Sequence, residues 1–356
     1  MADFISYLAW RAVNGAGVQP GELIVVMDHA GRDDVLRKVL LNIDLIGATP
    51  LPEIAPPDHL AKVLYAAETE HIAQMDKHRA AWMQQCDRII VLNGGWLDLA
   101  DAPAESIQAW SDAQSRLAEI EEARHTPNIV VAVPNEAQAQ RLGITLTDLE
   151  NLLHDPIVAP LLNLQNAALR IQHKLSGESF ILRSGANCVL RMKHGNRPVL
   201  MDDGYIDDAD RAHGAVLSNL PAGSVYTTVL EDTAEGALFL PAAGDARDVT
   251  LHFKEGCVFR VEAASGADEV EAMFDAHAGE SRRIGHISIG ANPHLRRPIG
   301  WPLVDEHVWG ALFVSFGENR YMGGENASAL NEAFALPDVA LEIDGATLLE
   351  YGRVST

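Results

Sequence analysis

The residues whose types could do chemistry gather around one histidine. His286 lies in the segment RRIGHISIGANPHLRR (residues 282–297), where alternating apolar residues predict a strand. In such a strand Ile284, His286 and Ser288 would share one face. A face that carries histidine and serine is typical of a cavity wall, and a histidine hydrogen-bonded within a core is the alternative. His286 is therefore a candidate for ligand binding, catalysis or metal coordination.

Arginine pairs lie at both ends of this segment, Arg282 with Arg283 and Arg296 with Arg297. A guanidinium group matches a carboxylate or a phosphate in bidentate fashion. Arg283 and Arg296 are therefore candidates for ligand binding, and ion pairing with an acidic surface is the alternative.

Carboxylates cluster in two places. The loop LEDTAEG (residues 230–236) lies between expected strands at 225–229 and 237–240. As a site it would place Glu231 or Asp232 at a strand end as a possible general base, and a plain hairpin loop is the alternative. Residues 201–210 hold five aspartates without the EF-hand spacing, which indicates a solvated turn. The chain has no CxxC, HExxH or GxSxG motif, so a site would have to be assembled from distant segments.

The elements that must position these residues are of two kinds. In the first half, apolar runs alternate with amphipathic stretches, which is the rhythm of a parallel α/β sheet. The helical region 147–175 opens with a possible capping box at Thr147 and Glu150, and Pro156 and Pro160 should split it in two. The expected strands are residues 22–27, 48–54, 87–92 and 128–133, with a helix at 33–46.

Beyond residue 179 the pattern changes to short strands joined by turn sequences, with one amphipathic helix from 267 to about 277. The sequence therefore predicts an open parallel α/β sheet domain with a connecting helix at residues 1–175. A mainly antiparallel β domain with a helix, an α+β unit, should follow at residues 176–356. The expected hairpins pair 188–192 with 199–201, 249–253 with 257–261, and 340–343 with 347–351.

Composition excludes several classes of protein. A net charge of -23 over 356 residues repels polyphosphates and anionic lipids, so no nucleic-acid or membrane partner is expected. The three cysteines lie far apart in the sequence, which fits reduced thiols. Without a secretion signal or a long apolar run, we expect a cytoplasmic protein.

Several segments, in order along the chain, carry a resemblance to a known family. They are GVQPGELIVV (17–26), GYID (204–207), NLPAGSVY (219–226), EDTAEGAL (231–238), GHISIGANP (285–293), DEH (305–307), VSFGEN (314–319) and MGGENAS (322–328). Together they resemble the thermophilic-type leucyl metallo-aminopeptidases and their relatives, the 2,5-dihydroxypyridine 5,6-dioxygenases. The likeness covers essentially the whole chain and is densest after residue 200. It implies the two-domain fold described above and a homodimer.

The resemblance also implies where metals would bind. The aminopeptidases hold two metal ions, and the corresponding positions carry Ser224, His286, Phe313, Asn331 and Ala333 here. Of these five, only His286 is an ordinary ligand. The dioxygenases hold one iron through that histidine and a terminal His-x-Asp, for which this chain has Asn331 and Ala333.

A shift of the terminal loop would bring a carboxylate to the vacant place. Glu325 or Glu332 would then join His286, with His294 or His307 as a third ligand. His286 and Glu332 are therefore weak metal candidates.

These observations favour a family member that has kept the fold and lost the metal-dependent reaction. We expect a non-catalytic protein without a cofactor that binds a peptide or small molecule and presents a peptide to a modifying enzyme in a biosynthetic pathway. The alternative is an iron- or zinc-dependent ring-opening dioxygenase or hydrolase of an N-heterocycle or peptide, with His286 and Glu231 or Tyr205 in the chemistry. The ligand-binding candidates are His286, Ser224, Asn331, Arg283, Arg296 and Phe313.

Overall fold

The computed structural model describes residues 3–55, 57–95, 99, 101–328 and 330–355. The chain divides into two compact units. Residues up to Ala159, with Gly204–Ala222 and Ile299–Val304, form the first unit, and the other residues form the second. The division is discontinuous and differs from the single boundary expected after residue 175. None of the described helices is long and apolar enough to cross a membrane.

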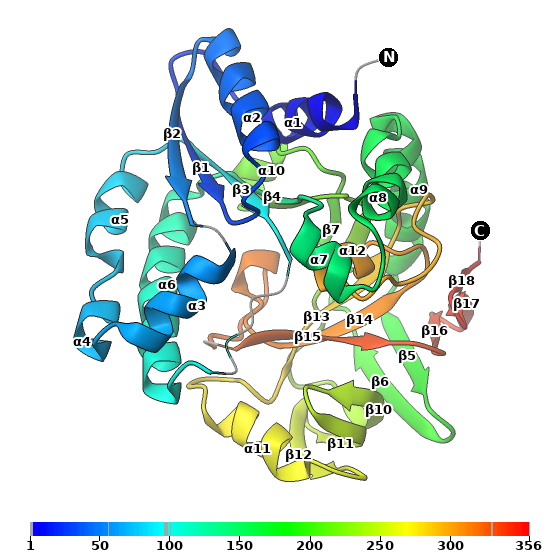
Figure 1. The fold of residues 1–356 in the computed structure, drawn as a ribbon. Helices are drawn as coiled ribbons and strands as arrows, with labels where there is room; N and C mark the ends of the chain where they lie inside the picture. Colours follow the sequence, from blue (N-terminus) through cyan, green and yellow to red (C-terminus); the bar gives the residue numbers. More distant parts are fainter. Residues whose placement is uncertain (1–2, 56, 96–98, 100, 329, 356) are drawn as a thin grey trace. The chain divides into compact units, whose positions relative to one another are not determined.

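An open parallel sheet of five strands lies at the centre of the first unit (Figure 1), which confirms the predicted α/β class. Ile24, Val25 and Val26 of β1 are fully buried, as expected for a parallel strand covered on both faces. In sheet order the strands are β2 (Thr49–Ile54), β1 (Leu23–Asp28), β3 (Arg88–Asn93), β4 (Asn128–Ala132) and β8 (Leu217–Leu220).

Helices connect these strands. α8 begins at a capping box in which Thr145 accepts from the Asp148 backbone, two residues before the expected one. Pro156 lies inside α8, so only Pro160 separates it from the next helix. The helices are α1 (Phe4–Gly15), α2 (Asp33–Ile46), α3 (Pro57–Ala66), α4 (Thr69–Ile72), α5 (Asp76–Met83), α6 (Ala104–Arg124), α7 (Glu136–Arg141), α8 (Leu146–Val158) and α10 (Asp208–His213), with α12 (Pro302–Asp305) where the chain leaves this unit.

Two antiparallel sheets form the second unit. The eight-stranded sheet has the order β12 (Cys257–Glu262), β11 (Ala246–Lys254), β10 (Glu235–Ala243), β6 (Cys188–Lys193), β5 (Ser179–Ser184), β16 (Ala340–Ile343), β17 (Ala346–Glu350) and β18 (Arg353–Val354). The five-stranded sheet has the order β15 (Asn331–Leu336), β14 (Leu312–Gly317), β13 (Ile284–Gly290), β9 (Ser224–Thr227) and β7 (Val199–Asp202). The unit also contains α9 (Leu161–Leu175), α11 (Ala267–Asp275) and the 3-10 helix η1 (Arg320–Met322).

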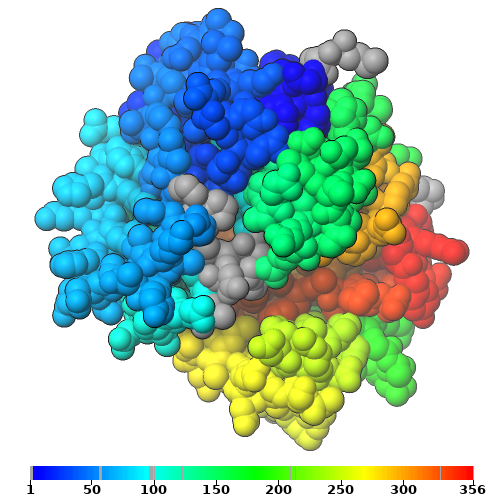
Figure 2. Space-filling view, viewed as in Figure 1, coloured from blue at the N-terminus to red at the C-terminus, as the bar shows by residue number. Residues whose placement is uncertain are grey.

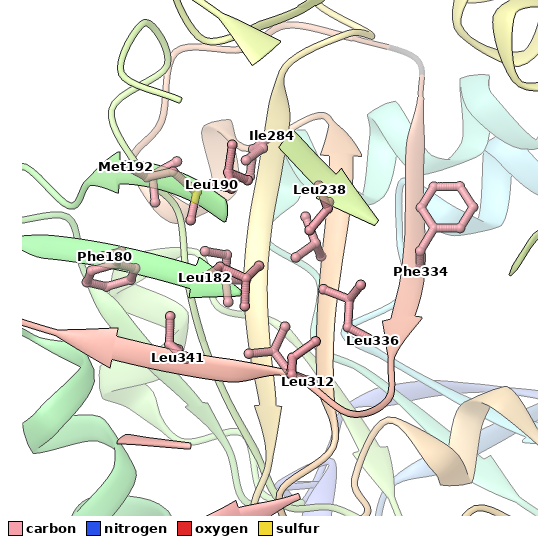
Figure 3. Packing of buried hydrophobic residues seen from close by; sticks show 14 of the residues in the cluster. Phe180, Leu182, Leu190, Met192, Leu238, Ile284, Leu312, Phe334, Leu336 and Leu341 are labelled. Carbon is pink, nitrogen blue, oxygen red and sulfur yellow. The ribbon is translucent and has the colours of Figure 1, made fainter. Parts of the chain in front are cut away.

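One apolar core joins these two sheets. Phe180 and Leu190 from the eight-stranded sheet cluster with Leu312 and Phe334 from the five-stranded sheet, as Figure 3 shows. Each large side chain buried in this way contributes about 1.5–3 kcal/mol to folding. One face of the five-stranded sheet packs in this core, so the polar side chains of its strands must lie on the opposite face of the sheet.

The expected hairpins are confirmed at β11 with β12 and at β16 with β17. The hairpin expected around residues 194–196 is wrong, because β6 pairs with β5 and β10 whereas β7 pairs with β9. The hairpin expected around residues 230–236 is also wrong. Its two strands, β9 and β10, belong to different sheets, so the loop that carries Glu231 crosses from one sheet to the other.

Candidate functional site

His286 projects from an irregularity in β13. The register with β14 shifts between Ile284 and Ile287, so that Gly285 and His286 together oppose Ser315. This bulge lets both isoleucines enter the core while His286 stays on the opposite face. The prediction that Ile284 shares a face with His286 is therefore wrong, because the extra residue breaks the two-residue alternation of the strand.

Ser315 holds His286 at its backbone and at its ring. The His286 backbone N–H donates to Ser315 Oγ at 2.8 Å, and the same Oγ lies 2.6 Å from His286 Nδ1. Since Oγ accepts the backbone hydrogen, its own hydroxyl hydrogen can be donated to Nδ1, and the ring proton is then assigned to Nε2. Nε2–H is thus the ring group left to meet a ligand.

The rings of His286 and Tyr321 are both uncharged at neutral pH. Burial lowers the pKa of His286 to about 4, against the opposing effect of the Glu306 carboxylate. The Tyr321 hydroxyl lies 3.4 Å from His286 Nδ1, and burial raises the pKa of Tyr321 to about 12 despite a hydrogen bond with Asn331. These rings therefore offer hydrogen bonds without a charge.

Further polar and aromatic side chains share the face of His286. Ser288 pairs with Tyr226 on β9 and with Phe313 on β14, and Ser224 pairs with the end of β13. The rings of Tyr226 and His286 lie 6.2 Å apart, edge to face. The side chains on this side of the sheet, which we call the His286 face, are Ser224, Tyr226, His286, Ser288, Phe313, Ser315, Asn331, Ala333 and Ala335.

β15 carries three of the predicted positions. It places Asn331 and Ala333 on the side of His286 and Glu332 on the other side. Ala333 pairs with Ser315, and Asn331 hydrogen-bonds to Tyr321. Glu332 lies between Asn331 and Ala333, so its side chain leaves the opposite side of the strand, where Phe334 enters the core. The structure thus brings Asn331 and Ala333 to the site but does not bring Glu332 there.

Glu231 is fully engaged in holding loops together. Its carboxylate accepts from Arg197 at 2.7 Å, from the Glu325 backbone N–H at 2.7 Å and from Asn319 at 3.2 Å. The Glu231 carbonyl accepts from Arg283 at 2.6 Å. Glu231 and Arg283, both predicted as site residues, and the backbone of Glu325 therefore serve as structural links in this arrangement.

The remaining candidates lie elsewhere. Arg282 pairs with Glu271 and Asp275 of α11, which is the ion-pairing alternative. His294 and Arg296 are exposed in the loop after β13. Tyr205 belongs to the first unit, so its predicted partnership with His286 stays a prediction.

His307 is a buried histidine that the sequence predicts only as a third metal ligand. It is completely buried, with Nε2 3.3 Å from Glu306 and 3.9 Å from Asp202. Burial lowers the pKa of His307, but the two carboxylates outweigh burial and hold this pKa above its usual value. Glu306 thus acts to raise the pKa of both His307 and His286.

The donor set around His286 does not fit a resident metal ion. The implied partner positions hold an amide and a methyl group, and Nδ1 is occupied by Ser315. Within the described ranges, no three histidine, cysteine or carboxylate side chains lie close enough to share one ion. A lone imidazole is a weak site for iron or zinc.

Ser315 and Tyr321 contact His286 but are not among the residues that the sequence predicts for the site. Ser315 follows Phe313 by two residues in a strand pattern, which could have placed both on one face. It is completely buried and its Oγ accepts a backbone hydrogen, so Ser315 orients the ring and is not exposed for nucleophilic attack. No local pattern marks Tyr321, because η1 reaches the site only through the tertiary fold.

The fold has counterparts among solved structures. A parallel α/β unit combined with an antiparallel β unit is the fold of aminopeptidase-like and dioxygenase-like proteins. The chain is similar to wild-type AmpT from Thermus thermophilus, with a TM-score of 0.75, 16% identity and 99% of each chain covered. It is also similar to a 2,5-dihydroxypyridine dioxygenase from Pseudomonas putida KT2440, with a TM-score of 0.64, 16% identity, and 100% of this chain and 99% of that chain covered.

Sequence comparison adds nothing to the structural likeness, since no protein-family model and no curated protein matches the chain. At 16% identity the likeness establishes the shared fold alone. The activity of this chain therefore has to be argued from its own residues.

Proposed function

We propose that this chain is a non-catalytic binding protein that takes up a peptide or a small neutral ligand on the His286 face, without a metal ion. One observation carries the proposal. The implied ligand positions around Ser315 hold His286, Asn331 and Ala333, which are an imidazole, an amide and a methyl group. Such groups hydrogen-bond an organic ligand well and hold a metal ion poorly.

The chemistry of the face favours a neutral, hydrogen-bonding ligand. Nε2–H of His286 can donate, while the Tyr321 hydroxyl and the Asn331 amide can both donate and accept. Phe313 and Tyr226 offer half-buried aromatic surface beside these polar groups. A few fixed polar groups set among aromatic side chains are the usual composition of a ligand site.

The edge of the sheet favours a peptide as that ligand. β15 is the terminal strand of its sheet, and its exposed residues Asn331, Ala333 and Ala335 lie on the His286 face. Ala333 and Ala335 pair with Ser315 and Phe313, and their small side chains add little bulk to this face. An extended peptide could pair with β15 through its main chain and direct a side chain toward His286. A protein of this kind would present a bound peptide to a modifying enzyme.

A second function has one observation in its favour. Metal-binding histidines usually bond a second group through the ring nitrogen that faces away from the ion, and His286 Nδ1 has such a partner in Ser315. With the proton on Nδ1, Nε2 would be available to iron. The alternative is therefore an iron-dependent dioxygenase that opens a dihydroxypyridine-like ring.

Selection of binders from a random hexapeptide library, followed by calorimetry with the selected peptides, tests both functions. We expect the affinity for the selected peptides to be unchanged by EDTA and at least about tenfold weaker in His286→Ala. Arg297→Ala is the control, because this side chain is exposed outside the His286 face, and its affinity should be unchanged. Loss of binding on chelation contradicts the proposal. Oxygen uptake with 2,5-dihydroxypyridine after Fe(II) is added would support the alternative.

A further inference from the structure

A hollow of about 460 Å³ lies in the second unit, on segments other than the strands of the His286 face. One wall is α9 and the other is the loop that follows β13, and Figures 1 and 2 show this green helix beside the orange loop. The lining residues are Asn163, Asn166, Ala167, Arg170, Pro293, His294, Arg296 and Trp309.

Both walls are fixed by local structure. The four residues that α9 contributes are spaced three, four and seven apart, which places them on one face of the helix. In the loop, the Asn292 side chain accepts from the His294 backbone at 3.0 Å, and Trp309 donates its backbone N–H to Leu295 at 2.9 Å. The backbone of each wall is therefore held by hydrogen bonds of its own.

The lining is positively charged in a strongly acidic protein. The chain has 50 acidic and 27 basic residues, yet the hollow is lined by two arginines and no carboxylate. Arg170 uses Nε to donate to the Asn166 carbonyl at 3.2 Å, which leaves its terminal nitrogens for a ligand. Over the described part of the chain, no carboxylate forms an ion pair with Arg170 or Arg296.

The rest of the lining completes a site for a particular shape of ligand. Asn163 and His294 can donate further hydrogen bonds. Trp309, Ala167 and Pro293 supply an apolar wall, and Trp309 is itself packed against the core of the unit. Two guanidinium groups beside an indole ring suit an oxyanion attached to a flat apolar body.

We propose that this hollow binds a small aromatic acid, with its carboxylate or phosphate group held by Arg170 and Arg296 and its ring against Trp309. The proposal goes beyond the binding proposed for the His286 face and is independent of it. Both a carboxylate and a phosphate monoester have the required chemistry, so the test includes one of each.

Calorimetry with benzoate, phenyl phosphate, benzamide and inorganic phosphate tests the proposal on the full chain. Benzoate or phenyl phosphate should bind, and the tighter of the two identifies the acidic group. Benzamide, which lacks the charge, and inorganic phosphate, which lacks the ring, should bind at least about tenfold more weakly. Affinity for the aromatic acid should fall as salt is added.

Three variants locate the binding. Arg170→Gln and Arg296→Gln should each lower the affinity for the aromatic acid at least about tenfold. Arg297 is an exposed neighbour outside the lining, so Arg297→Gln should change this affinity less than twofold. His286→Ala should leave this binding intact, which separates it from the function proposed above. An unchanged melting temperature in each variant excludes misfolding.

Several outcomes would overturn the proposal. It is wrong if neither benzoate nor phenyl phosphate binds. It is also wrong if Arg297→Gln loses as much affinity as Arg170→Gln and Arg296→Gln, because an equal loss indicates a general charge effect. Loss of binding in His286→Ala would place the ligand on the His286 face instead.

Discussion

Replacing Ser315 with alanine should release His286 from its fixed position. The substitution removes the acceptor of the His286 backbone N–H, at 2.8 Å, and the partner of Nδ1, at 2.6 Å. A buried donor without a partner costs about 1–3 kcal/mol, and the second hydrogen bond contributes about 1 kcal/mol. Because His286 is half-buried, water can replace part of this bonding. We therefore expect the free energy of unfolding to fall by about 2 kcal/mol.

Ser288→Ala is the matched control, because Ser288 is a buried serine two residues from His286 on the same strand and face. Urea unfolding followed by circular dichroism should show a change below about 1 kcal/mol for this control. In the native protein, nitrogen-15 spectra of labelled histidine should place the His286 proton on Nε2. The reasoning is refuted if Ser315→Ala is as stable as Ser288→Ala and the ring keeps its tautomer.

Three further predictions concern the same unit. The folded pKa of His286 is lowered to about 4, so its contribution to stability is complete above the unfolded value near 6.5 and is lost as pH falls toward 4. The free energy of unfolding, measured with urea at pH 4.5 and 7.5, should therefore differ between the two pH values by up to about 3 kcal/mol less in His286→Gln than in the wild type. Glu231→Ala should cost about 3 kcal/mol in urea unfolding because it leaves the Arg197 guanidinium unpaired, while a loss below 1 kcal/mol would show that Glu231 is not a structural link. The double substitution Asn331→His with Ala333→Asp adds two donors beside His286 and should create stoichiometric Fe(II) or Zn(II) binding, measured by calorimetry; no gain in metal affinity would mean that β15 does not face His286 as described.

The elements that the sequence predicted well are those whose signals are local. β1, β3 and β4 are continuous apolar runs, as parallel strands buried on both faces must be. β8 was not assigned to this sheet, because its four residues, LSNL, carry little strand signal and follow the sheet's other strands at a long distance in sequence. Pairing between distant segments is decided by tertiary packing, which local periodicity does not report.

The sequence predicts only the part of the site that depends on local strand periodicity. Alternation correctly placed His286 and Ser288 on one face, but a bulge removed Ile284 from it. The expectation that Glu231 is a general base assumes that it lies at a strand end, whereas β9 ends at Thr227 and the Glu231 carboxylate is bound to Arg197 and Asn319. Tyr321 and Ser315 become neighbours of His286 only through the fold, so their roles needed coordinates.

The central claim is that the His286 face binds its ligand without a metal ion. Elemental analysis by mass spectrometry tests it most directly, on protein as purified and after anaerobic incubation with Fe(II) or Zn(II) followed by desalting. We expect far less than one metal ion per chain, with the same residual amount in wild type and in His286→Ala. Stoichiometric iron or zinc in the wild type that disappears in His286→Ala would contradict it.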